Sequence, residues 1–206
     1  MPRTTPTLAA SALAAVSFPA FAHHFMDGDL PATFAQGLLS GLGHPVVGLD
    51  HAAFIVVAGF LLAPLERGLP GVLALIAGTL AGAWLHLGGV GLPGGEAGVA
   101  LSVVLAGVLT MARRRVALPW LAGGLALAGV LHGYAYAETI VGAEATPLAA
   151  YLIGFSAVQL GIAAAAYFAH RRMIAAGEAW TRPASSLLGA VVGAIGLAYL
   201  TAGVTG

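Results

Sequence analysis

Residues 33–63 read TFAQGLLSGLGHPVVGLDHAAFIVVAGFLLA, an apolar run that contains His44, Asp50 and His51. A helix needs about 20 predominantly apolar residues to cross a bilayer, so this run is long enough to span one. Ionisable side chains are costly at that depth, and they usually face a bundle interior or an aqueous cavity and mark an ion or proton path. Imidazole nitrogens and a carboxylate, without sulfur, suit a borderline divalent metal ion. These three residues are therefore the first candidates for a functional site.

The composition of the whole chain indicates a membrane protein. Of its 206 residues, 59% are hydrophobic, only 8% are charged and 30 are glycine. These values are far from the averages of soluble domains. We therefore expect an all-α fold, a polytopic bundle of transmembrane helices in the lipid bilayer.

Missing residue types exclude several classes of function. The sequence contains no cysteine, which excludes disulfides, thiolate metal sites and a catalytic thiol. It contains no lysine, so it carries no Walker-type phosphate loop and is not expected to use ATP. Its formal net charge is zero and its arginines lie in short clusters, a pattern that gives no footprint for a nucleic-acid partner.

Residues 1–22 resemble a secretory signal peptide. Arg3 supplies a positive start, residues 8–18 form an apolar core too short to span, and residues 20–22 provide a small-x-small cleavage site. An uncleaved anchor is the alternative. Cleavage would leave His23 and His24 at the mature terminus, where they could capture metal, although chain ends are often disordered.

Six apolar runs follow this leader, most of them near the length of a spanning helix. They are residues 33–63, 70–92, 96–112, 117–137, 147–169 and 184–204. Pairs of small residues four positions apart would let these helices approach closely in lipid. The pairs are Gly78 with Gly82, Gly129 with Gly133, and Gly189 with Gly193. We predict a single six-helix transmembrane transport domain over residues 23–206.

The arginines predict the orientation, because loops rich in arginine stay cytoplasmic. All arginines after the leader fall in alternate loops, namely Arg67, Arg113, Arg114, Arg115, Arg171, Arg172 and Arg182. The remaining loops and the amino-terminal segment hold acidic residues instead, namely Asp27, Asp29, Glu96, Glu138 and Glu144. We therefore expect both mature termini in the periplasm of a bacterial inner (cytoplasmic) membrane.

The first run is predicted to break near His44 and Pro45. Proline removes a backbone hydrogen bond and clashes with the carbonyl one turn earlier. On an unbroken helix, His44 and His51 would share a face but stand about 10.5 Å apart along the axis, too far for one ion. A break would bring them closer and free carbonyl oxygens as additional ligands.

A rise of about 1.5 Å per residue places His51, His86 and His132 at one level of three different helices. Glu96 and Glu138 lie above that level and would form an acidic entrance. A single intramembrane histidine such as His86 is as readily explained by a hydrogen bond between helices. Tyr134 and Tyr136 are interpreted as interfacial or packing aromatics rather than ligands.

The pattern His44-Pro-x-x-Gly48-x-Asp50-His51 resembles the signature of the HupE/UreJ family of bacterial nickel and cobalt permeases. The likeness extends to the exported leader, to the turn at 93–96 with the following residues 98–102, and to residues 131–133. It implies metal handling by His44, Asp50, His51, Glu96, His132 and Glu138. Many relatives carry a second histidine after the one corresponding to His132, where this chain has tyrosines.

The resemblance implies a secondary permease that takes up Ni²⁺ or Co²⁺ from the periplasm into the cytoplasm. The ion would be the transported substrate, no prosthetic group is expected, and the sequence sets no oligomeric state. An alternative from another class is an intramembrane metal-dependent hydrolase, in which zinc would activate water. His44 to Asp50 and His132 to Glu138 also share a six-residue offset on antiparallel helices, as in an inverted repeat of 33–112 against 117–204.

Overall fold

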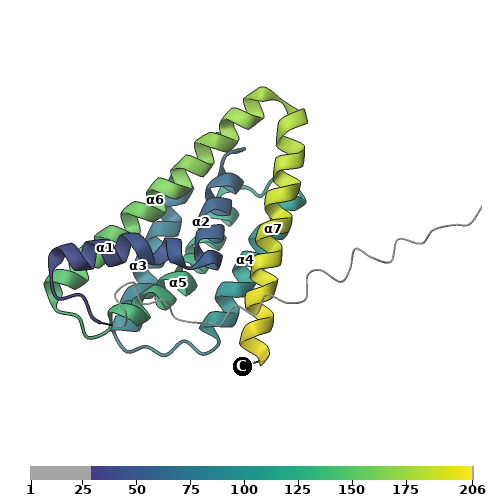
Figure 1. Ribbon diagram of the computed structural model, residues 1–206. Helices are drawn as coiled ribbons and strands as arrows, with labels where there is room; N and C mark the ends of the chain where they lie inside the picture. The colour runs from purple at the N-terminus through teal and green to yellow at the C-terminus, as the bar shows by residue number, and fades with distance from the viewer. Residues whose placement is uncertain (1–28, 206) are drawn as a thin grey trace, which may run out of the picture.

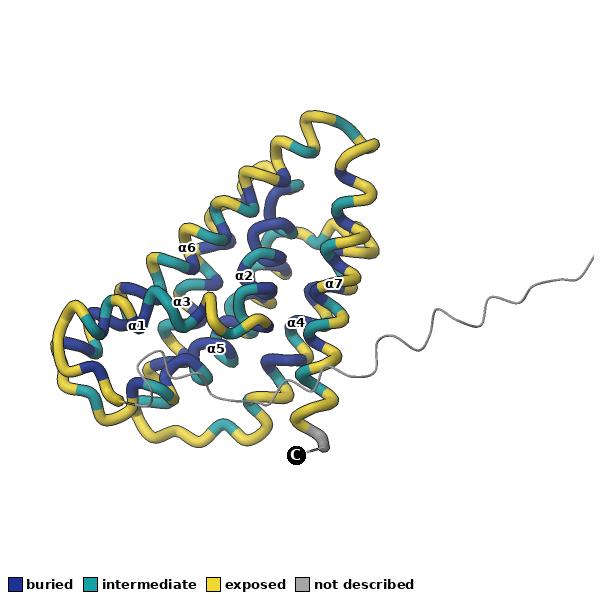
Figure 2. Tube along the Cα trace, viewed as in Figure 1, coloured by how far each residue is buried: buried dark blue, intermediate teal, exposed yellow. Residues whose placement is uncertain are grey.

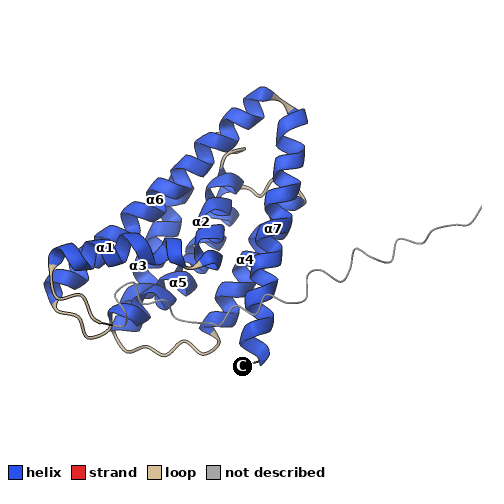
Figure 3. Cartoon of the chain, in the orientation of Figure 1, coloured by secondary structure: helices blue, strands red, loops and turns tan. Residues whose placement is uncertain are grey.

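The computed structural model describes residues 29–205. The predicted leader, residues 1–22, and the two histidines that follow it lie outside the described residues. Across the described chain every regular element is helical and there is no strand (Figure 3), which confirms the expected all-α class.

In the described part of the chain, seven α-helices and one 3-10 turn form the bundle. Their arrangement is shown in Figure 1. Their bounds are α1 Phe34–Val47, α2 Leu49–Leu62, α3 Pro70–Leu87, α4 Gly95–Met111, α5 Leu118–Ala137, η1 Glu138–Ile140, α6 Ala145–Ala176 and α7 Glu178–Thr205. The first predicted run is divided between α1 and α2. The other five runs correspond to α3, α4, α5, α6 and α7, in that order. The largest differences are that α3 ends earlier than predicted, α6 runs on to Ala176, and α7 begins at Glu178, which leaves Pro183 inside a helix.

Four of these helices are long and apolar enough to cross a membrane, namely α3, α5, α6 and α7. The bent pair α1 and α2 raises the number to five when it is taken as one span, and α4 is apolar but only 17 residues long. The sixth span therefore depends on α4. Large apolar side chains stay exposed, including Leu73, Leu127 and Leu187, as expected for a surface in contact with lipid. Exposed positions recur along the helices in Figure 2.

The break in the first run lies at Gly48, not at Pro45. Pro45 sits inside the last turn of α1, and α1 and α2 meet at an angle of 81°. A proline ring is compatible with helical φ, and the lost hydrogen bond alone does not stop the helix before Val47. The helix ends where Gly48 turns to an extended conformation, with φ −72° and ψ 108°.

Close backbone contacts at glycines join the helices in pairs. A Cβ at Gly133 of α5 would meet the Thr79 carbonyl oxygen of α3, and one at Gly154 of α6 would lie 2.6 Å from the Leu38 carbonyl oxygen of α1. In the third pair, a Cβ at Gly107 of α4 would lie 2.7 Å from the Cα of Gly193 in α7. The predicted packing role of the small-residue pairs is confirmed.

All the arginines among the described residues lie at one end of the bundle, where Glu66 and Glu178 also lie. α2, α4 and α6 end, and α3, α5 and α7 begin, at one end, which we call the arginine end because the adjoining segments hold Arg67, Arg113, Arg114, Arg115, Arg171, Arg172 and Arg182. At the opposite end, which we call the acidic end, Glu96 lies in the first turn of α4 and Glu138 directly follows α5. The sequence predicted this segregation of charge from alternate loops.

Candidate functional site

The bend between α1 and α2 brings His44 and His51 together. Their ring centroids are 6.3 Å apart, much closer than an unbroken helix would allow. Two imidazoles that share an ion, each nitrogen at about 2.1 Å from it, place their centroids roughly 5 to 6.5 Å apart, so this separation is compatible with one ion. A Cβ at Gly48 would lie 2.6 Å from Cδ2 of His51, so glycine leaves room for that ring.

His51 is held by a chain of hydrogen bonds that reaches α5 and α4. His51 Nδ1 lies 2.8 Å from His132 Nδ1, and His132 Nε2 lies 2.9 Å from Ser102 Oγ. Ser102 Oγ also lies 2.7 Å from the carbonyl oxygen of Val99. His132 is completely buried and stacks on Phe54, with ring centroids 4.2 Å apart.

This chain sets the tautomer of His51. The carbonyl of Val99 can only accept a hydrogen bond, so the Ser102 hydroxyl donates to it. The Ser102 oxygen must then accept the second hydrogen bond, from the Nε2–H of His132. Neutral His132 then accepts at Nδ1 from the His51 Nδ1–H. In neutral His51 this leaves Nε2 unprotonated, the form in which imidazole binds a metal ion.

Asp50 supplies a buried negative charge next to these rings. Its side chain lies in the first turn of α2 and is only 7% exposed. The carboxylate interacts electrostatically with His51, Tyr136 and Tyr199. A negative side chain in a first turn also offsets the positive end of the helix dipole, which would otherwise disfavour a cation at the bend.

Tyr136 belongs to the same cluster. Its ring centroid lies 4.7 Å from that of His51 and 5.4 Å from that of His44. The side chain is fully buried, and its hydroxyl has no hydrogen-bond partner among the described residues. Tyr136 is a packing aromatic, one of the two predicted interpretations, and not an interfacial one, because it is fully buried with its ring centroid 5.7 Å from that of Phe155. Its hydroxyl is an unsatisfied polar atom on a ring that lies beside the candidate ligands.

Thr139 and Tyr151 border the cluster on the side of His44. Thr139 Oγ1 lies 3.4 Å from His44 Nδ1 and 3.4 Å from the Tyr151 hydroxyl, which donates to the carbonyl oxygen of Tyr136 at 2.7 Å. These contacts connect α1, η1, α5 and α6 around the bend.

His86, Glu96 and Glu138 form a separate group toward the acidic end. Glu138 interacts electrostatically with His86 and Glu96, and the rings of His86 and Tyr134 meet edge to face at 4.3 Å between centroids. The structure thus brings His132 to His51 as the predicted depth implied, but it does not bring His86 into contact with either. Rise per residue fixes the height of a side chain but not the direction in which it points.

Within residues 29–205, no three histidine, aspartate or glutamate side chains are gathered tightly enough to hold a metal ion. Sequence reasoning did not place Ser102, Thr139 and Tyr136 beside the candidate ligands, where the structure has them. The signal for Tyr136 was its position four residues after His132, which places both on one face of α5. Ser102 gave the same kind of signal, as a polar residue inside an apolar run.

The family model described as HupE / UreJ protein matches residues 11–199. The chain is also similar to "Protein HupE" of Rhizobium leguminosarum bv. viciae, with 29% identity over 126 residues, which is 60% of this chain and 63% of that protein. The match therefore covers less than two thirds of that relative. No solved structure matches the chain.

Proposed function

Since the chain belongs to the HupE/UreJ family, we propose that it is a secondary permease that carries Ni²⁺ or Co²⁺ from the periplasm into the cytoplasm. One observation carries this proposal: His44, Asp50 and His51 lie at an 81° bend inside an apolar helical bundle, with Asp50 buried. Ionisable residues in such surroundings are retained for an ion or proton path. Their nitrogen and oxygen atoms match the ligand preference of these two ions.

The residues of the cluster take different roles in this proposal. His51 Nε2, His44 and the Asp50 carboxylate would bind the ion, and Tyr136 would hydrogen-bond to a water that the ion retains. His132 would orient His51 through the Nδ1 contact of 2.8 Å, as outer-shell partners do for metal-bound imidazoles. The rings would move slightly to close around the ion, since the resting arrangement is not a complete ligand set.

The acidic end would be the periplasmic entrance, where Glu96 and Glu138 concentrate cations, and the arginine end would face the cytoplasm. Six spans, with α4 as one of them, place the termini of the mature domain outside. A cleaved leader over residues 1–22 agrees with this orientation.

Transport inward needs no ATP in this scheme. A dication that moves down a negative-inside potential of about 100 mV gains about 4.6 kcal/mol, enough for roughly three decades of accumulation. Exchange against protons is a compatible variant, because imidazoles titrate near neutral pH.

The direct test uses purified protein in liposomes that contain a metal-sensing dye. We expect uptake of Ni²⁺ or Co²⁺ that rises with a negative-inside potential, measured with competing Zn²⁺ and Mn²⁺ and with or without a proton gradient. Asp50→Asn should lower uptake at least about tenfold, because a charge-assisted contact contributes roughly 1.5 to 3 kcal/mol. Glu66→Gln removes the same charge from an exposed loop and should leave uptake unchanged. Equal uptake by Asp50→Asn and the unmodified protein would refute the proposal.

The alternative of an intramembrane metal-dependent hydrolase makes a different prediction. An enzyme of that class would release lipid fragments when zinc is added to the same liposomes, whereas a permease leaves the lipids intact. Mass spectrometry of the lipids after the transport assay decides between the two.

A further inference from the structure

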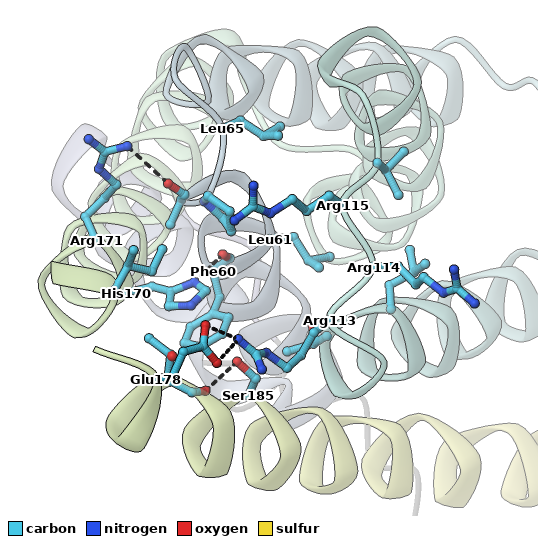
Figure 4. A pocket seen from close by; sticks show the side chains of 17 residues that line it. Phe60, Leu61, Leu65, Arg113, Arg114, Arg115, His170, Arg171, Glu178 and Ser185 are labelled. Atoms are coloured by element: carbon cyan, nitrogen blue, oxygen red, sulfur yellow. Dashed lines mark hydrogen bonds and ion pairs between the residues drawn. The ribbon is translucent and has the colours of Figure 1, made fainter. Parts of the chain in front are cut away.

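A cavity of about 150 Å³ lies at the arginine end and takes no part in the proposed transport site. Its walls come from the end of α2, the end of α4, the α4–α5 loop, the end of α6 and the beginning of α7 (Figure 4). A single water molecule needs only about 10 to 15 Å³ on this measure, so the cavity has room for a group as large as a phosphate.

Four arginines line this cavity, namely Arg113, Arg114, Arg115 and Arg171. The only carboxylate in the lining is Glu178, which accepts two hydrogen bonds from Arg113 at 2.6 and 2.7 Å. Among the described residues, no carboxylate pairs with the other three arginines. The lining therefore keeps a net positive charge that its own residues do not neutralise.

Three of these arginines follow α4 in a turn that begins with a left-handed residue. Arg113 adopts φ 53°, in the left-handed region, and is the only such residue other than glycine among the described residues. This turn ends α4 and starts the loop that carries Arg114 and Arg115. Figure 4 shows Arg113 reaching Glu178 and Arg171 reaching a backbone carbonyl, with Arg115 between them in that view. That carbonyl belongs to Ala63, 3.4 Å from Arg171 Nη1.

The lining also has an apolar part, which includes Leu61, Leu65, Leu109 and Ile174, beside the polar residues Thr110, His170, Thr181 and Ser185. Ile174 is 41% exposed on the outside of the bundle, so the apolar wall continues to the surface. A free phosphate ion makes no favourable contact with apolar side chains. An anionic phospholipid would use both parts, with its headgroup phosphate on the arginines and its acyl chains along the leucines and isoleucine.

We propose that this cavity binds the phosphate headgroup of an anionic phospholipid. Guanidinium groups suit it because they are planar, always charged and able to form paired hydrogen bonds with phosphate oxygens. The site does not depend on the proposed transport function, because it shares no residue with the His44, Asp50 and His51 cluster. Bound lipid would join α2, α4, α6 and α7 at one end of the bundle.

The test is native mass spectrometry of the full-length protein in neutral detergent, with phosphatidylglycerol and phosphatidylcholine titrated separately. We expect one phosphatidylglycerol molecule to bind more tightly than phosphatidylcholine. The double variant Arg115→Gln/Arg171→Gln should weaken phosphatidylglycerol binding at least about tenfold, because it removes charged hydrogen bonds to the phosphate. The matched control Arg172→Gln/Arg182→Gln removes the same charge from the same end but outside the cavity, and should retain binding within about twofold.

Three results would overturn the proposal: equal losses in both double variants, no loss in the cavity variant, or full displacement of the lipid by inorganic phosphate at an equal concentration. The first would mean general attraction between basic loops and anionic lipid, and the last a site for free anions. The single variant Arg115→Gln, at an exposed position, gives the same comparison if the double variant does not fold.

Discussion

At the residue scale, Gly48 and Asp50 show how a short pattern builds a polar site in an apolar environment. Gly48 ends α1, turns the chain through the bend and leaves space for the ring of His51. Asp50 then falls in the first turn of the next helix, where its charge is favourable and buried beside the imidazoles. The spacing of glycine, aspartate and histidine therefore has a geometric cause.

Tyr136→Phe separates a structural role from a functional one. The hydroxyl of Tyr136 is buried without a partner, so its removal breaks no protein hydrogen bond and should raise the free energy of unfolding by up to about 1 kcal/mol. If the hydroxyl hydrogen-bonds to a water on the ion, metal uptake by the variant should fall about tenfold although its stability does not fall. A tenfold loss corresponds to a rise of about 1.4 kcal/mol in the free-energy barrier to transport.

Tyr151→Phe is the matched comparison, because the Tyr151 hydroxyl donates to the Tyr136 carbonyl at 2.7 Å. This variant should lose roughly 1 kcal/mol of stability. Thermal unfolding in detergent and uptake into liposomes measure the two properties. Unchanged uptake by Tyr136→Phe would show that its hydroxyl has no part in transport.

The site residues were only partly predictable from sequence. Three ionisable groups within eight residues stand out in an apolar run, and the contact between His51 and His132 agrees with their predicted depth but does not follow from depth alone. Ser102 was not singled out as a site residue and Tyr136 was interpreted as an interfacial or packing aromatic, because hydroxyl groups are common in membrane helices and their direction depends on how the helices are rotated. His86 was placed with the other histidines for the same reason, since rotation is set by packing.

At the element scale, the helices were predictable because hydropathy and proline mark where spans begin and end. The break was displaced by three residues, from Pro45 to Gly48, because a proline is tolerated within a last turn when the chain bends immediately afterwards. The pairing of helices was foreseeable only in part. Small residues four apart indicate that a close contact exists but not which helix supplies it.

Two glycines of α5 give a matched test of this packing. A Cβ at Gly133 would meet the Thr79 carbonyl oxygen of α3, whereas a Cβ at Gly124 has nothing within 4 Å. Gly133→Ala should therefore destabilise the protein by about 1 to 3 kcal/mol through steric conflict. Gly124→Ala should be neutral or stabilise by up to about 1 kcal/mol through helix propensity. Thermal unfolding of both variants checks this, and the reverse order would show that α3 and α5 do not pack as described.

At the scale of the whole molecule, charge divides the bundle into an arginine end and an acidic end. The main packing pairs are α3 with α5, α1 with α6 and α4 with α7. In the predicted inverted repeat, the first run corresponds to α5, α3 to α6, and α4 to α7. The pair of α3 with α5 then corresponds to the pair of α6 with the first run, which contains α1. The pair of α4 with α7 corresponds to itself. The inverted repeat stays a prediction, and this pairing is what it requires.

The orientation can be tested because the chain has no cysteine. A single cysteine introduced as Glu96→Cys should react in intact cells with a thiol reagent that does not cross the inner membrane. Arg114→Cys should react only after the membrane is opened. Labelling of Arg114→Cys in intact cells, with Glu96→Cys protected, would invert the topology and the direction of uptake.

The central claim is that His44, Asp50 and His51 bind the transported dication at the bend between α1 and α2. Anomalous X-ray diffraction from crystals grown with Ni²⁺ or Co²⁺ tests it most directly, because the signal locates the metal itself. The account predicts a peak between the rings of His44 and His51, within about 2.2 Å of a nitrogen of each and of an Asp50 oxygen. A metal peak elsewhere in the bundle, with these three side chains outside its coordination sphere, would contradict it.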